Sequence, residues 1–289
     1  MKHRSPRLEL AALWLGLLYL AAAVHPPTAR AGAWLQPPGK SFVKASLLRQ
    51  SSERRWDCRG GTIAADPAGA FQQTQLFVYA EHGLREWLTL SSSWAYKDQR
   101  IDGDQDYGTR STGDFRFGSR VPLLRGPRPV SFEANLSFPT YERSDLNDPP
   151  ALRTQYLPAG SGRVEGELHA LAGASLWPLP LYVNTDVGWR SRGGDFEDQW
   201  LLALEVGASS PYFFAKTELR WALPMNESCD EQSAAGTLAL HERIVSISPE
   251  MAVRLRGPLW LNLGYSHPIS GRNSLSAGVW SAGFTFRDS

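Results

Sequence analysis

Apolar and polar residues alternate along most of the chain beyond about residue 40. Successive side chains of a β-strand point to opposite faces, so a repeat of two indicates strands with one apolar and one polar face. The segment 130–138 shows the pattern clearly. Its two interleaved sets are Val130, Phe132, Ala134, Leu136 and Phe138 on one face, and Ser131, Glu133, Asn135 and Ser137 on the other.

Twelve such segments follow one another, separated by turn residues. The first covers roughly Lys40 to Arg49, and the last places Trp280, Phe284 and Phe286 on one face. Many of them are close to the ~9–11 residues of a tilted strand that spans a membrane. Strands of soluble sheets are shorter, at about 5–6 residues. The pattern therefore predicts an all-β fold, a single antiparallel transmembrane β-barrel of about twelve strands.

One stretch, residues 238–256, breaks the alternation. Its apolar positions change from even (Leu238, Leu240) to odd (Met251, Val253), and Pro249 lies between them. A β-bulge would reset the parity and accommodate the proline. Two shorter strands are the alternative.

The connections between segments alternate in length, apart from those at 193–195 and 268–273, which fit less clearly. The short connections are 82–84, 124–129, 177–180, 209–211 and 256–258, and the long ones are 50–70, 99–111, 140–161 and 224–236. Outer-membrane barrels have short periplasmic turns and longer extracellular loops. This alternation favours a barrel over a secreted, soluble two-sheet sandwich, whose strands also alternate.

The first 31 residues have a different composition. A basic start (Lys2, Arg4, Arg7) precedes an uncharged, mostly apolar run over 10–24, and small residues flank Arg30. This order is typical of a secretory signal peptide, here cut between Ala31 and Gly32. The apolar run is shorter than the ~20 residues of a spanning helix, which disfavours an uncleaved anchor. We expect a signal peptide at 1–31 and a barrel at 32–289.

Charge and composition agree with a membrane protein and not with a nucleic-acid-binding one. Lys and Arg total 30 against 29 Asp and Glu, so there is no basic excess for nucleic acid. The 11 Trp and 9 Tyr suit the interfaces of a membrane. The mean hydropathy of −0.31 is compatible with this fold, because only alternate residues of a barrel strand face lipid. The predicted partner is therefore outer-membrane lipid.

Two cysteines, Cys58 and Cys229, fall in connections predicted to be extracellular. Export to an oxidising compartment allows a disulfide between them. Two unpaired thiols are the alternative, because a sequence does not show the distance between them. Neither cysteine has a CxxC partner or a cluster of histidines, so no metal site is predicted.

The charged residues of the polar faces are the candidate functional residues. A charge on the lipid face would cost ~2–4 kcal/mol at mid-bilayer, so these side chains are expected to point into the lumen. They are Asp114, Arg116, Arg120, Glu133, Glu165, Glu167, Asp186, Arg190, Arg192, Glu205, Lys216, Glu218, Arg220 and Arg254. Such a lining suits a passive channel or conduit for small or oligomeric polar solutes. The alternative is a plugged structural or surface-interaction barrel, in which acids and bases pair and extracellular loops bind a partner.

Enzymatic chemistry is not predicted, and neither is a cofactor. A barrel lipase needs a serine and a histidine oriented by a third polar group. No serine near His82, His169, His241 or His267 has a nucleophile signature. Residues 102–106 resemble the start of a calcium loop, but Tyr107 and Gly113 stand where Gly and Glu are required, so a solvated acidic loop is favoured.

Several stretches resemble a bacterial family of outer-membrane barrels. They are residues 79–90 (YAEHGLREWLTL), 113–120 (GDFRFGSR), 139–142 (PTYE), 183–194 (VNTDVGWRSRGG) and the start Gly32-Ala-Trp34 followed by Pro38-Gly-Lys40. The family comprises XagA-like proteins, linked to surface polysaccharide, and outer-membrane transporters assigned to a phenol-degradation (MetA) pathway. The resemblance covers most of the chain after residue 31. It implies an outer-membrane barrel, and its motifs are structural and not catalytic.

Overall fold

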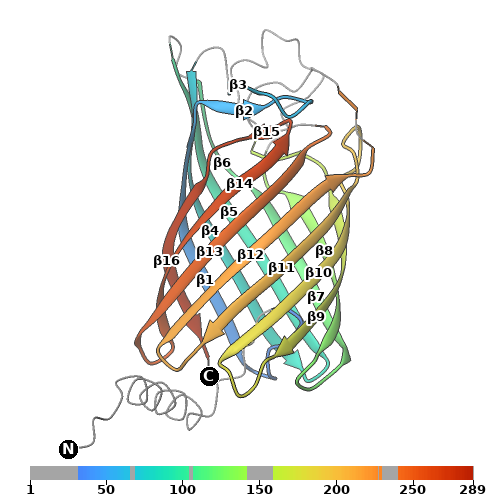
Figure 1. Cartoon of the computed structure of the whole chain (residues 1–289), viewed down its shortest axis with the longest axis vertical. Coiled ribbons are helices and arrows are strands. Elements are labelled where there is room, and N and C mark those ends of the chain that lie inside the picture. Colours follow the sequence, from blue (N-terminus) through green and yellow to red (C-terminus); the bar gives the residue numbers. More distant parts are fainter. Residues whose placement is uncertain are drawn as a thin grey trace, which may run out of the picture.

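The computed structural model describes residues 32–65, 69–103, 107–141, 159–226, 228–229 and 240–288. These residues form a closed antiparallel barrel with a small sheet across one end (Figure 1). The expected signal peptide, including Ala31, lies outside the described residues and remains a prediction. The described residues contain no helix that is long and apolar enough to cross a membrane.

Twelve strands form the wall, as predicted. In chain order they are β1 (Ser41–Ser52), β4 (Gly69–Arg85), β5 (Leu88–Gly103), β7 (Asp114–Leu124), β8 (Val130–Pro139), β9 (Glu165–Ser175), β10 (Leu181–Ser191), β11 (Gln199–Ser209), β12 (Phe213–Pro224), β13 (Arg243–Arg256), β14 (Leu259–Arg272) and β16 (Val279–Arg287). Each strand pairs with the next one along the chain, and β16 closes the barrel against β1.

Four short strands lie outside this ring. β6 (Tyr107–Thr112) pairs with the end of β5 and lengthens the wall there. β2 (Arg54–Trp56), β3 (Thr62–Ala64) and β15 (Ser274–Leu275) make a separate three-stranded sheet. We call this sheet the cap, because it lies across the upper end of the barrel in Figure 1. We call the capped end the outer end, and the opposite end, where the chain finishes, the inner end.

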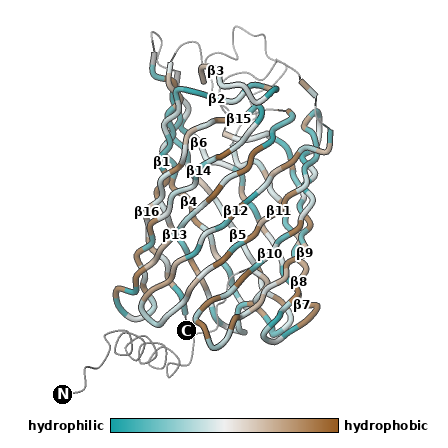
Figure 2. The backbone as a smooth tube through the Cα atoms, viewed as in Figure 1, coloured by the Kyte–Doolittle hydropathy of each residue, from teal (hydrophilic) through white to brown (hydrophobic). Residues whose placement is uncertain are grey.

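The outward face of the wall is apolar, as the alternation predicts. Figure 2 shows brown apolar and teal polar positions alternating along the strands. Large apolar side chains are exposed on nearly every strand, among them Leu47, Leu76, Phe117, Leu136, Leu168, Val187, Leu204, Met251, Leu263 and Phe284. In water such a surface would be unstable, whereas lipid tails solvate it at no cost.

The short turns all lie at the inner end, and one of them differs from the prediction. β4 does not turn at 82–84: His82 pairs with Leu90 and Gly83 with Thr89, and the strand continues to Arg85. The turn is therefore made by Glu86 and Trp87. The glycine that suggested a turn has another role, described below.

From Arg243 onward the irregular stretch is a single strand, β13, and the β-bulge lies on the neighbouring strand β14. The register shifts between Val245 and Ser246, which pair with Ser270 and Pro268, so the extra residue is Ile269 of β14. Leu240 belongs to the turn before β13, and Leu238 lies outside the described residues. Pro249 pairs with Thr217 of β12, while the β14 side of the ladder is interrupted there, which suits a residue without an N–H.

Candidate functional site in the barrel interior

One ion pair identifies the inward face of the wall. Lys44 of β1 contacts Glu250 of β13, with 2.6 Å between Nζ and Oε1, although β16 and β14 lie between those two strands. Side chains can meet in this way only across the inside of the barrel. The inward face therefore carries the even residues of β1 and of β13.

The strand registers extend this face around the barrel. Lys44 pairs with Tyr79 of β4, and the same ladder leads through Ser93 and Arg116 to Ser137. Followed strand by strand, the ladder places on this one face Asp114, Arg116, Arg120, Glu133, Glu165, Glu167, Asp186, Arg190, Glu205, Lys216, Glu218, Arg220 and Arg254. Arg192 directly follows the end of β10.

The first cluster inside the barrel centres on Arg120 of β7. Its guanidinium lies 2.6 Å from Glu133 of β8 and 3.1 Å from Glu81 of β4. The Arg120 side chain is only 7% exposed, so both ion pairs are shielded from water. Burying these charges is tolerable because each one is paired and hydrogen-bonded. Sequence reasoning missed Glu81, which also accepts a hydrogen bond from Tyr79 at 2.5 Å.

A second cluster surrounds Glu167 of β9. Arg190 of β10 lies 2.5 Å from this carboxylate, and Arg116 of β7 contacts it across β8. His169 lies between two acids, with Nε2 3.1 Å from Glu167 and Nδ1 2.9 Å from Asp186. The two arginines and three further ionisable groups thus form one connected network on the inner wall.

A third cluster lies on β10, β11 and β12. Lys216 contacts Glu205 at 2.7 Å, and the buried Tyr182 hydroxyl donates to the same carboxylate at 2.8 Å. Further along β12, Arg220 pairs with Glu218 at 2.8 Å. Acids and bases are therefore matched locally, and no long run of one sign lines the described interior.

The remaining predicted residues lie near the ends of the barrel. Toward the outer end, Asp114 accepts a hydrogen bond from Tyr141 at 2.9 Å, and Glu165 accepts one from Ser161 at 2.7 Å. Arg192 lies over the ring of Phe196, with 4.7 Å from its Cζ to the ring centroid. Arg254, at the inner end, instead donates to the carbonyl of Gly257 in the β13–β14 turn at 2.6 Å.

A segment that sequence reasoning missed, residues 32–40, crosses the interior at the inner end. Ala33 is completely buried, and its carbonyl accepts a hydrogen bond from Ser131 of β8 at 2.5 Å. Gln36 donates to Glu81 of β4 at 2.7 Å, and Arg120 donates to the carbonyl of Trp34 at 3.2 Å. Because β8 and β4 are separated by two strands, the segment joins distant parts of the wall.

Packing completes this inner plug. The Trp34 ring meets the Tyr182 ring edge-on at 6.3 Å, and Tyr182 stacks on Phe214 of β12 at 6.3 Å. A side chain on Gly173 of β9 would collide with the Trp34 ring, so this glycine makes room for the plug. Gly83 allows an equally close approach: a side chain there would collide with the carbonyl of Pro37, beside the hydrogen bond from Gly39 N to Gly83 O at 2.7 Å.

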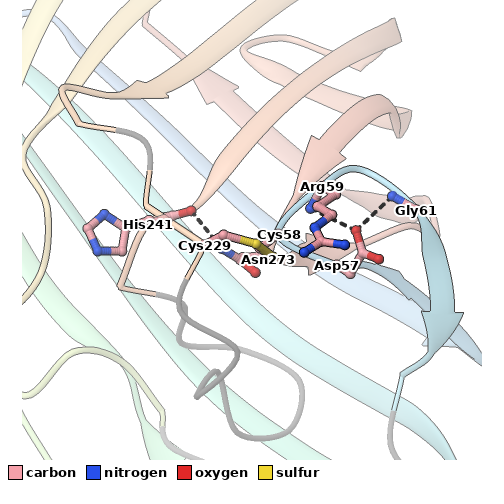
Figure 3. Close-up of a disulfide and its surroundings, with 7 residues drawn as sticks. All are labelled: Asp57, Cys58, Arg59, Gly61, Cys229, His241 and Asn273. Atoms are coloured by element: carbon pink, nitrogen blue, oxygen red, sulfur yellow. Dashed lines mark hydrogen bonds between the residues drawn. A yellow bond between two sulfur atoms is a disulfide. The ribbon is translucent and has the colours of Figure 1, made fainter.

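The outer end is closed by the cap and by a covalent bond. Cys58, after β2, forms a disulfide with Cys229 in the β12–β13 connection, with 5.0 Å between the Cα atoms. Figure 3 shows this disulfide beside Asn273, whose amide donates to the carbonyl of His241 at 3.1 Å. The predicted disulfide is therefore confirmed. Within the cap, Trp56 of β2 pairs with Ser274 of β15, which lies in the connection between β14 and β16.

A serine and a histidine side chain contact each other in the described chain. Ser41 and His82 lie 2.9 Å apart at the inner rim, on the outward face, but the described chain places no third group on His82 to orient it. A serine nucleophile normally needs such a group. Within the described ranges, no three His, Cys, Asp or Glu side chains are grouped to hold a metal ion. The acidic stretch 102–106 lies partly outside those ranges.

No protein-family model and no curated protein matches this chain. Among solved structures, it is similar to the COG4313 outer membrane channel from Pseudomonas putida F1, with a TM-score of 0.65 and 13% identity over 92% of this chain and 100% of that one. It is also similar to the NanC porin, with a TM-score of 0.51 and 9% identity over 83% of this chain and 98% of that one. At such identities the likeness shows the fold, which is that of outer-membrane β-barrels. The XagA-like resemblance remains a prediction.

Proposed function

We propose that this chain is an outer-membrane conduit for small polar solutes, closed at its inner mouth by residues 32–40. The supporting observation is that the closing element is not part of the wall. It is a nine-residue segment held by hydrogen bonds to Ser131, Thr89 and Arg120 and by the packing of Trp34. Displacing it would leave the twelve-stranded wall intact, with a polar passage inside.

The lining decides which solutes suit such a passage. Glu81, Glu167, Glu205, Arg120 and Lys216 present charged groups along the inward face. A polar solute can exchange hydrogen bonds with these groups as it moves, whereas an apolar one would desolvate them without compensation. Because the signs are balanced, we expect weak selectivity between anions and cations. A link to oligomeric solutes such as surface polysaccharide is part of the same proposal and rests on the family resemblance.

A second candidate is a structural or surface-interaction barrel that never opens. The observation in its favour is the cap, which the Cys58–Cys229 disulfide joins to a second connection at the outer end. With both ends closed, the outer connections would supply the function by binding a partner. A secreted, soluble β-protein receives no support from the apolar outward face.

Single-channel conductance in planar bilayers separates these two candidates. We expect low conductance from the chain beginning at Gly32, and a several-fold higher value when residues 33–38 are deleted. Gly173→Val should act in the same direction, because its side chain would displace the Trp34 ring. Gly166→Val is the matched control: it lies on β9 too, but a side chain there meets only Leu136 at an ordinary distance of 3.8 Å.

A folded deletion variant without conductance would support the structural candidate. If the deletion variant folds as a heat-modifiable barrel and still does not conduct, the plug is not a gate and the conduit proposal fails. Heat-modifiability on a denaturing gel gives the folding check, because a closed barrel migrates differently before and after boiling.

A further inference from the structure

The outer half of the barrel contains a cavity of about 300 Å³. Its wall is made by inward side chains of β1, β4, β5, β13, β14 and β16, and residues Asn273–Leu275 of the cap region close it above. Small-molecule sites have volumes of roughly 300–1,000 Å³, so this one is at the lower end of that range. It lies at the opposite end of the interior from the plug, and no contact of the plug involves it.

Gln99 and Gln73 line this cavity and belong to a chain of three hydrogen-bonded glutamines. Gln99 donates from Nε2 to Gln73 at 2.7 Å, and Gln73 donates in turn to Gln75 at 3.0 Å. In this arrangement the amide nitrogen of Gln99 points to Gln73, and its oxygen takes no part in the chain. Its oxygen is then the free end of the chain, and the hydrogen bonds behind it strengthen it as an acceptor.

The oxygen of Gln99 has no hydrogen-bond partner among the described residues. The side chain is 1% exposed, so bulk water does not compensate for the missing bond. Buried amide oxygens are nearly always satisfied, and an exception calls for a specific explanation. A ligand hydroxyl in the cavity would supply the missing donor after a small movement of the wall.

Two other side chains of the lining also carry acceptor oxygens. Gln50 uses its Nε2 on the carbonyl of Ala277 at 3.0 Å, which leaves its oxygen for a ligand. The carboxylate of Glu242 lines the cavity without a hydrogen bond from the described residues. Lys97 is the one basic side chain of the lining, so the lining carries one formal charge of each sign, and Lys97 is already donating to the carbonyl of Ala159.

We propose that this cavity binds a small, neutral, polyhydroxylated solute of the mono- or disaccharide class. Such a solute offers several hydroxyl donors to Gln99, Gln50 and Glu242, and the balanced charge of the lining disfavours ionic solutes. The inference names the substrate class of the conduit and so rests on the function proposed above. Binding alone, however, requires no conduction, and it can be measured separately.

The test is isothermal titration calorimetry on the refolded, disulfide-bonded chain in detergent micelles, with D-glucose, sucrose and glycine as probes. We expect saturable binding of at least one of the two sugars and none of glycine. Gln99→Met, which keeps the shape but removes the acceptor, should weaken sugar binding about tenfold, the effect of one lost hydrogen bond. Gln72→Met is the control, since Gln72 is on the neighbouring strand β4 but bonds to Arg100 on the outward face.

The other outcomes contradict either the sugar site or the conduit. Glycine binding in place of sugar, or equal sugar affinity in Gln99→Met and the parent chain, would overturn the site. If Gln99→Met fails to fold by heat-modifiability, Glu242→Met, which also removes an acceptor, supplies the second variant, with the same weakening expected. A chain that conducts when the plug is deleted but binds neither sugar refutes only this inference. A chain that binds sugar but never conducts refutes the conduit and leaves the site.

Discussion

The two ends of the barrel are closed by different means. At the inner end, residues 32–40 enter the interior and are held by hydrogen bonds, ring packing and the close approach of Pro37 to Gly83. At the outer end, the cap lies across the mouth and a disulfide joins it to a distant connection. The first closure can be released by thermal motion, whereas the second cannot open fully without breaking a covalent bond.

This difference predicts which end of the barrel controls passage. Contacts of the plug contribute individually about 0.5–1.5 kcal/mol per hydrogen bond, and such contacts are broken and re-formed readily. The cap instead lies over the cavity of about 300 Å³ and stays joined to the β12–β13 connection for as long as the disulfide is intact. We therefore expect perturbations at the inner end to change conductance and those at the outer end to change stability and binding.

The largest effect is expected from Arg120→Met. This arginine joins Glu81, Glu133 and the carbonyl of Trp34, so its loss leaves two buried carboxylates without their cationic partner and removes one hydrogen bond of the plug. The free energy of unfolding should fall by about 3–5 kcal/mol, the usual cost of breaking a buried ion pair. Urea unfolding in micelles, followed by tryptophan fluorescence, measures the change.

A matched arginine provides the control for this prediction. Arg100 pairs with Asp102 on the outward side, where its side chain is 58% exposed. Arg100→Met should therefore change the free energy of unfolding by only about 0–1 kcal/mol. Equal effects of the two substitutions would show that the interior cluster contributes no more than a surface pair.

Removing the disulfide is expected to have the next largest effect on the free energy of unfolding. It also tests whether the outer end affects stability and not conductance. Cys58 and Cys229 are 171 residues apart, so their bond strongly restricts the unfolded chain. The double substitution Cys58→Ser, Cys229→Ser should lower the free energy of unfolding by about 2–4 kcal/mol. Conductance should stay low, because the inner plug is untouched. A rise in conductance, or the same rise on reduction of the parent chain, would move the gate to the outer end.

The parts of the fold that follow a local rule could be predicted from the sequence. Alternation identifies the wall strands and separates Glu133 from Leu136, because lipid and lumen act on every second residue. The disulfide was predictable because there are only two cysteines and both fall in connections assigned to one side. The turn at Glu86 and Trp87 was misplaced because Gly83 suggested an earlier one.

The parts that depend on distant contacts could not be predicted. Trp34 and Gln36 belong to a segment without periodicity, and their partners in the wall, Gly173 and Glu81, are far along the chain. The only local signal was a tryptophan followed by two prolines before the first strand. Gln99 follows the same logic: the sequence pattern placed it at the start of the long connection 99–111, whereas it lies on β5. Its unpaired oxygen depends on how β5 meets β4.

The smallest expected effect is a pH dependence at the outer end. Glu242 lies in the turn before β13, and burial raises the pKa of its carboxyl above the usual value of 4.5. The nearby Arg192 and Arg190 oppose this rise in part, and the negative charge of Glu165 adds to it. The folded chain therefore holds this proton more tightly than the unfolded chain, and stability falls as pH rises from 4.5 through the higher folded value. Glu242→Gln removes this dependence, so the variant should match the parent chain in acid and be the more stable of the two at neutral pH. Urea unfolding of both chains between about pH 4 and pH 8 checks this. Parallel curves would mean that Glu242 is solvated, which would also weaken its assignment to the sugar site.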